Sequence, residues 1–106
     1  MTEYLQIFST VDSDAAAGRI AAELVERRLA ACVQIVPKLR SVYWWQGKVE
    51  EAEEYLLLIK STEKQYPALE AAVRELHPYA CPELVGLKIA AGLPAYLDWL
   101  GNEVRE

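Results

Sequence analysis

The sequence has few cysteines, glycines and prolines, and it has no long apolar run. Its two cysteines, in a chain without a CxxC motif, exclude a disulfide scaffold and a zinc ribbon. Its five glycines and five prolines exclude a collagen-like or low-complexity chain. No apolar segment approaches the roughly 18 residues of a membrane span, and the first residues lack the basic region and cleavage site of a signal peptide. We therefore expect a cytoplasmic protein with no membrane partner.

Basic residues are in the minority as well. Eleven Lys and Arg residues stand against sixteen Asp and Glu residues, which gives a formal net charge of −5. The one basic pair, Arg27 and Arg28, follows a predicted helix, where it complements the helix dipole better than it would form a phosphate-binding patch. The chain has no basic face for nucleic acid, so we expect no nucleic-acid partner.

The composition that remains is that of a globular domain. Apolar residues make up 53% of the chain and charged residues 25%. A length of 106 residues without repeats or linkers predicts a single domain over residues 1–106. Folding a chain of this size buries about 65% of its surface, which is enough for a core without disulfides or metals.

Hydrophobic periodicity predicts an alternating order of strands and helices. Leu5, Ile7 and Val11 fall on one face of a strand, and Gln46-Gly47 is typical of a two-residue hairpin turn. The predicted elements are a strand at 4–11, a helix from about 14 to 28, strands at 31–45, 48–60 and 84–89, a helix ending at 76, and a short helix after residue 94. This order predicts a ferredoxin-like β-α-β-β-α-β domain of the α+β class with a C-terminal helix. Its sheet is antiparallel, with two helices on one face.

The central hairpin is too long for a domain of this size. Each arm has about 13 residues and spans about 43 Å, whereas the radius of gyration expected for the whole domain is about 13 Å. Its tip carries the apolar cluster Val42, Tyr43, Trp44 and Trp45, which is too large to leave in water. The arm either bends over its own core or packs on a neighbouring subunit. We favour subunit contacts through Val42, Trp44 and Trp45, with a bulge near Pro37.

Soft and borderline metal donors are sparse. His77 is the only histidine, and a lone histidine at a helix end also serves to cap carbonyls. Cys32 and Cys81 are expected at opposite edges of the sheet, about 14 Å apart, so one chain does not join them. Cys32 is also suited to the core as a small apolar thiol. His77 is expected near Ser9 and Thr10 at the end of the first strand.

An acidic run follows the hairpin turn and comprises Glu50, Glu51, Glu53 and Glu54. Paired carboxylates on one strand face can transfer protons or bind hard cations, but such a run also keeps an edge strand soluble. The sequence contains no nucleophile-elbow, phosphate-loop, dinucleotide or zinc-protease motif. We therefore expect no enzymatic activity.

Several stretches together resemble the CutA family of divalent-cation tolerance proteins. In order they are residues 29–37 (LAACVQIVP), 41–48 (SVYWWQGK), 58–62 (LIKST), 77–79 (HPY) with 82–84 (PEL), and 96–100 (YLDWL). They cover nearly the whole chain. The resemblance implies a cytoplasmic homotrimer of ferredoxin-like protomers whose long hairpins reach neighbouring subunits. It also implies tolerance to divalent metal ions and copper binding.

The resemblance also implies where copper binds. Some members use a cysteine at the end of the first strand and a histidine pair before Pro-Tyr. Here the first position is Ser9 and the pair is Leu76 and His77, so only His77 keeps a good ligand. Cys32, in the Ala-Ala-Cys motif, is the second-choice thiol ligand. The implied copper site is therefore a weak one.

Two further functions stay open. The architecture also resembles PII signal proteins, trimers that bind nucleotides in clefts between subunits. Tyr43, Glu54, Lys60 and Tyr79 match motif positions near such a cleft, which would bind a small ligand without metal. A structural trimer that anchors another protein would instead expose an apolar patch outside its subunit contacts.

Overall fold

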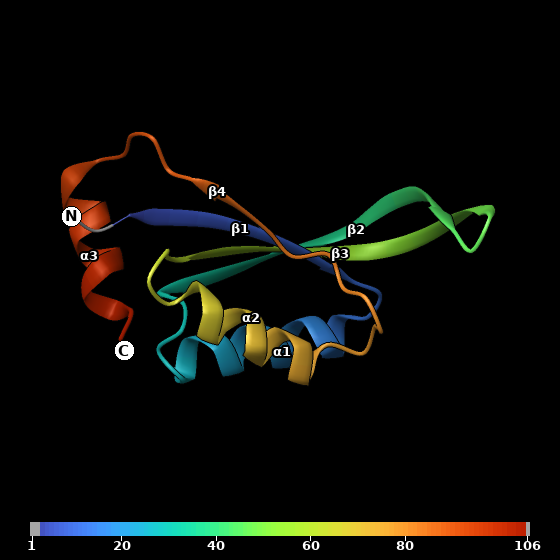
Figure 1. The fold of residues 1–106 in the computed structure, drawn as a ribbon, viewed down its shortest axis with the longest axis horizontal. Helices are drawn as coiled ribbons and strands as arrows, with labels where there is room; N and C mark the ends of the chain where they lie inside the picture. The colour runs from blue at the N-terminus through green and yellow to red at the C-terminus, as the bar shows by residue number, and fades with distance from the viewer. Residues whose placement is uncertain (1–2, 106) are drawn as a thin grey trace.

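The computed structural model describes residues 3–105. Its elements follow the predicted order (Figure 1). They are β1 (Tyr4–Val11), α1 (Asp14–Glu26), β2 (Cys32–Trp45), β3 (Lys48–Thr62), α2 (Tyr66–Leu76), β4 (Val85–Lys88) and α3 (Pro94–Glu103). The ferredoxin-like α+β prediction is confirmed.

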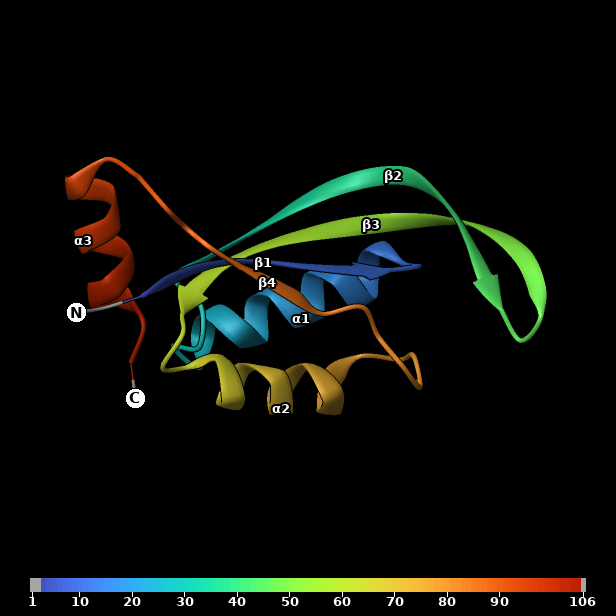
Figure 2. The ribbon, with the colours of Figure 1, turned by 45° about the horizontal axis from the view of Figure 1, so that its top comes forward.

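The four strands form one antiparallel sheet in the order β2-β3-β1-β4. Helices α1 and α2 lie side by side against one face of the sheet, while α3 stands at the end where the N-terminal strand begins (Figures 1 and 2). As predicted, β2 and β4 are the edge strands, and the start of β4 lies beside the end of β1. Within residues 3–105, no helix covers the opposite face of the sheet.

The core lies between the two helices and the sheet. Its fully buried members include Ile7, Ile20, Leu24, Leu57, Ile59, Leu69 and Val73. The alternation expected in β1 is confirmed, because every second residue from Leu5 to Val11 is buried. In β3, Leu57 and Ile59 are buried under the helices, while the alternate residues are half-buried on the face that no helix covers.

Helix α1 begins and ends at recognisable caps. The Ser13 side chain accepts a hydrogen bond of 3.1 Å from the amide of Ala16 and so caps the N-terminus of the helix. The helix ends at Glu26, two residues before the predicted end. The reason is Arg28, whose φ of 63° places it in the left-handed region that terminates helices. Its guanidinium pairs with Glu103 at 2.8 Å and so connects this turn to α3.

The hairpin of β2 and β3 extends well beyond the body of the domain and gives the chain its longest dimension, 44 Å (Figure 2). The two turn residues, Gln46 and Gly47, have φ values of 50° and 80°, as a two-residue hairpin turn requires. The register shifts between Val36 and Leu39, at the predicted bulge beside Pro37. Beyond this bulge the arm is free to change direction.

Candidate functional site

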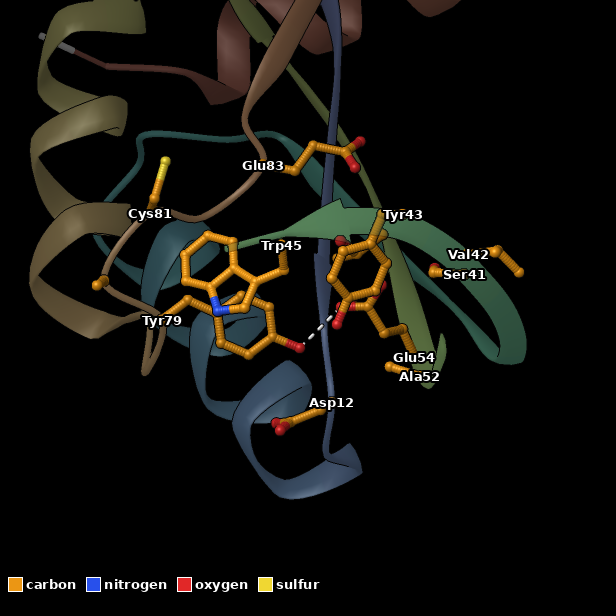
Figure 3. Close-up of a pocket in the computed structure, with 12 residues that line it drawn as sticks. Asp12, Ser41, Val42, Tyr43, Trp45, Ala52, Glu54, Tyr79, Cys81 and Glu83 are labelled. Atoms are coloured by element: carbon orange, nitrogen blue, oxygen red, sulfur yellow. Dashed lines mark hydrogen bonds between the residues drawn. The ribbon is translucent and has the colours of Figure 1, made fainter. Parts of the chain in front are cut away.

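A cavity of about 680 Å³ lies between the hairpin arm, the end of β1 and the loop that follows α2 (Figure 3). Its lining comprises Thr10, Asp12, Ser41, Val42, Tyr43, Trp45, Ala52, Glu54, Tyr79, Ala80, Cys81 and Glu83. The cavity depends on the fold at two points. The β1–β4 pairing places the loop beside the end of β1, and the arm beyond the bulge closes the other side.

Aromatic rings form part of the walls. Tyr43 and Trp45 come from the same face of β2, and Tyr79 comes from the loop after α2 (Figure 3). Tyr43 is 41% exposed and Trp45 is 48% exposed, so both rings keep uncovered surface. The arm therefore presents two aromatic side chains to a space within its own chain.

Glu54 and Tyr79 form the central polar contact. The Tyr79 hydroxyl donates a hydrogen bond of 2.7 Å to Glu54 Oε2. Glu54 is only 6% exposed, whereas Glu50, Glu51 and Glu53 are exposed on the arm. The exposed carboxylates of the other three residues can keep the strand soluble, but this role does not account for the buried carboxylate of Glu54. Burial raises the pKa of the Tyr79 phenol, and the hydrogen bond to the Glu54 carboxylate and its charge raise it further.

Two hydrogen bonds of His77 hold the loop that follows α2 against the end of β1. The His77 Nδ1 accepts a hydrogen bond of 3.1 Å from the amide of Tyr79. A ring nitrogen that accepts carries no proton, so Nε2 carries it and donates to the carbonyl of Thr10 at 2.8 Å. The ring is 6% exposed and lies edge-on to Tyr79, with 4.6 Å between ring centroids. Both nitrogens of the predicted metal ligand are therefore engaged by the protein backbone.

The second predicted ligand, Cys32, lies elsewhere. Cys32 lies opposite Lys60 in the register of β2 and β3. The Thr10 carbonyl, which is hydrogen-bonded to His77, belongs to a residue that lies opposite Leu56 in the register of β1 and β3. Four residues along β3 correspond to about 13 Å, so Cys32 and His77 do not share a metal ion within one chain. Among residues 3–105, no group of three or more His, Cys, Asp or Glu side chains is placed to hold a metal.

Of the four residues predicted near a cleft between subunits, Tyr43, Glu54 and Tyr79 line this cavity of the single chain, whereas Lys60 does not. Lys60 lies six positions beyond Glu54 along β3, a separation of about 20 Å. Its ammonium donates a hydrogen bond of 2.6 Å to Gln34 Oε1. The structure brings Tyr43, Glu54 and Tyr79 together around the cavity, and the ammonium group of Lys60 lies outside it.

The sequence pattern does not place Asp12, Cys81 or Glu83, which line the cavity, in a ligand site, although it includes Cys81 among the possible metal donors. Asp12 directly follows β1, and Cys81 and Glu83 precede β4, so the expected adjacency of these strands was the available signal. The Ser9 hydroxyl, which is buried, donates a hydrogen bond of 2.7 Å to the carbonyl of Glu83 and holds the loop at this edge. Cys81 is an exposed free thiol at the cavity.

The hairpin residues predicted to contact other subunits divide into two sets. Val42 is 62% exposed and Trp44 is 74% exposed, and they alternate with Tyr43 and Trp45 along β2. Trp45 thus lines the cavity of its own chain, although Val42 also reaches its rim. Trp44 projects from the opposite face of the arm and is not part of the lining.

Replacing Tyr79 by Phe is expected to reduce the loss of stability at high pH. The folded pKa of Tyr79 lies above its ordinary value of 10.0, so the folded chain holds this proton more tightly than the unfolded chain. The resulting stabilisation is complete below pH 10 and falls as the pH rises above it. Urea unfolding between pH 8 and pH 11 measures the effect. Tyr55→Phe is the control, because the Tyr55 hydroxyl has no hydrogen bond within residues 3–105. An unchanged profile in Tyr79→Phe would contradict the expectation.

Comparison with known sequences gives a consistent result. The family model described as CutA1 divalent ion tolerance protein matches residues 5–103. Divalent-cation tolerance protein CutA of Thermus thermophilus is 54% identical over 94 residues, which are 89% of this chain and 91% of that protein. Protein CutA of Homo sapiens is 42% identical over 93 residues, which are 88% of this chain and 52% of that protein. The chain thus spans about half the length of the human relative.

Solved structures share the whole fold. The divalent cation tolerance protein (Cut A1) from Thermus thermophilus matches with a TM-score of 0.94 at 50% identity, covering 96% of this chain and 99% of that one. CutA1 from Oryza sativa matches with a TM-score of 0.95 at 42% identity, covering 98% of this chain and 95% of that one. Within residues 3–105, no helix is long and apolar enough to cross a bilayer.

Proposed function

Because the chain belongs to the CutA1 divalent ion tolerance family, we propose that it acts as a homotrimer that binds copper weakly. The family match over residues 5–103 is the observation that carries the metal-tolerance function. Copper is the ion proposed because imidazole and thiol are donors that it favours. The chain offers these donors at His77, Cys32 and Cys81.

The hydrogen bonds of both His77 ring nitrogens to the backbone account for the low copper affinity that we propose. To bind copper, an imidazole nitrogen must first give up its contact with Thr10 or Tyr79. Copper binding therefore competes with closure of the loop after α2. Cys32 lies too far from this ring to assist it within one chain, so we propose that its thiol is a separate and weaker ligand.

Equilibrium dialysis against copper at neutral pH tests this proposal. We expect wild type to retain copper and His77→Ala to lose most of it, while Cys32→Ser loses a smaller part. Cys81→Ser is the matched control, since it also removes a free thiol. Equal retention by wild type and His77→Ala would overturn the assignment of His77. Loss of copper in Cys81→Ser alone would place the ion in the cavity instead.

The proposed trimer is supported by apolar surface that the single chain leaves in water. On the arm, Trp44 is 74% exposed and Val49 is 59% exposed. On the sheet face without helices, Val36, Val85 and Leu87 are between 41% and 55% exposed. An arm that projects from each chain can cover such a face on its neighbour and remove both surfaces from water.

We also propose a role without catalysis, in the cytoplasm. The only imidazole of the chain has both nitrogens bonded to backbone groups, so it is not free to activate a nucleophile. Both cysteines are free thiols, which suits a reducing compartment.

A second candidate function is the binding of a small ligand, and the cavity favours it. Its volume of about 680 Å³ is typical of small-molecule sites. This candidate does not depend on copper or on His77 as a ligand. An adaptor role has no comparable feature in its favour.

A further inference from the structure

We propose that the cavity beneath the hairpin arm binds an organic polycation, a small linear polyamine with several ammonium groups. Three features carry this inference: the sign of the charges around the cavity, its aromatic walls, and its size. The proposal goes beyond metal tolerance, and it requires neither copper nor an imidazole ligand.

The charges around the cavity have one sign. Asp12, Glu54 and Glu83 line it, and no Lys, Arg or His stands among its twelve lining residues. Glu54 is the buried member, at 6% exposed. Its Oε2 accepts from Tyr79, and its Oε1 receives no hydrogen bond from any residue within 3–105. Because no buried side-chain oxygen within residues 3–105 lacks a hydrogen-bond partner, this second oxygen is accessible to solvent, and an ammonium N–H of a ligand can bind it there.

The aromatic walls select an organic cation. Tyr43, Trp45 and Tyr79 surround the same space as these carboxylates (Figure 3). The negative face of an aromatic ring attracts an ammonium group, and this attraction grows when the pair is removed from water. The methylene groups between the amines would also cover the exposed surface of Tyr43 and Trp45.

Two other ligand classes fit this cavity less well. A nucleotide needs positive charge for its phosphates, and Lys60, the cation among the predicted cleft residues, lies about 20 Å from Glu54 along β3. An inorganic cation needs several donors within about 2.6 Å of one point. No group of three or more acidic, His or Cys side chains meets in this way within residues 3–105.

The size of the cavity favours a chain of amines over a single one. At about 680 Å³ it is much larger than one ammonium group needs. The carboxylates come from three different segments, namely the end of β1, the arm and the loop before β4. A flexible polyamine can place separate ammonium groups at separate carboxylates.

Isothermal titration with spermidine tests the proposal on the full chain. We expect saturable binding with one spermidine per chain, which weakens but persists when the salt rises to physiological levels. Glu54→Gln should weaken binding at least about tenfold, because it removes the buried charge. The amide oxygen still accepts from Tyr79, so the variant should keep its fold, which circular dichroism and sizing verify.

Glu53→Gln is the matched control, because it removes the same charge from the neighbouring, exposed position of β3. We expect it to change spermidine affinity by less than about twofold. Equal weakening by the two variants would overturn the proposal and leave only attraction to the net charge. Tyr43→Leu should also weaken binding, through loss of the aromatic face.

Competition separates this proposal from the others. ATP in place of spermidine should give no saturable heat, and saturable ATP binding that Glu54→Gln leaves intact would favour a nucleotide site instead. Copper should not displace spermidine from the cavity. Stoichiometric displacement, together with loss of copper retention in Glu54→Gln, would make the cavity a metal site. If copper retention depends on His77 and not on Glu54, copper binding and spermidine binding use separate sites, as we propose.

Discussion

Replacing Trp44 by Glu is expected to dissociate the proposed trimer at micromolar concentrations. Trp44 is the most exposed large apolar side chain of the arm, at 74%. Covering such an indole removes about 150 Å² from water and contributes about 4 kcal/mol per arm. This corresponds to about 1,000-fold in affinity for each contact. A carboxylate in the same contact would add the cost of its own desolvation.

Size-exclusion chromatography with light scattering measures this effect. Wild type should elute as three chains of 11.9 kDa each, and Trp44→Glu as one. Gln46→Glu is the control, since it places the same charge at the turn of the arm without removing apolar surface. A trimer that survives Trp44→Glu would show that the outer face of the arm is not at the subunit contact. A wild-type protein that elutes as a single chain would contradict the proposed trimer.

The two faces of the arm explain why the sequence left two alternatives for it. A run of aromatic residues shows only that the surface must be covered. The alternation of β2 then places Tyr43 and Trp45 against the cavity of their own chain and Trp44 away from it. The sequence predicted the length of the arm, its turn and its bulge, because each depends on local signals. The direction of the arm beyond the bulge depends on its packing.

The position of Glu54 in the alternation of β3 is the one sequence signal that indicates its burial at the cavity. Glu54 lies two residues before Leu56 and therefore on the same face of β3 as the half-buried apolar residues of that strand. This continuity distinguishes Glu54 from its exposed neighbours and could have marked it as buried. Lys60 satisfies the same alternation, yet it lies at the far end of the strand. Periodicity gives the face of a side chain, but only the register gives its position along the strand.

The contribution of the loop after α2 was the hardest part to foresee. Asp12 and Cys81 are far apart in sequence, and the strand order alone brings them near one edge. The contacts that fix the loop there are hydrogen bonds to backbone groups, from Ser9 to Glu83 and from His77 to Thr10. Such bonds have no sequence signature beyond a lone polar residue. For that reason His77 resembled a metal ligand before its partners were known.

Replacing His77 by Ala is expected to lower the free energy of unfolding by about 2–4 kcal/mol. The change leaves the Thr10 carbonyl and the Tyr79 amide without their partner and empties the space of a ring that is 6% exposed. Urea unfolding at one fixed chain concentration measures this loss, because assembly makes apparent stability depend on concentration. A change below about 1 kcal/mol would contradict the assigned bonds.

Two conservative variants separate the two bonds of His77. The amide nitrogen of Gln reaches the position of Nε2 and can still donate to Thr10, whereas the amide oxygen of Asn lies near Nδ1 and can still accept from Tyr79. We therefore expect hydrogen exchange at the Tyr79 amide to accelerate in His77→Ala and His77→Gln but to stay slow in His77→Asn. Both variants should recover part of the stability lost in His77→Ala. Recovery of stability without recovery of copper would separate the structural role of this residue from its role as a ligand, and protection of the Tyr79 amide in His77→Ala would contradict the structural role.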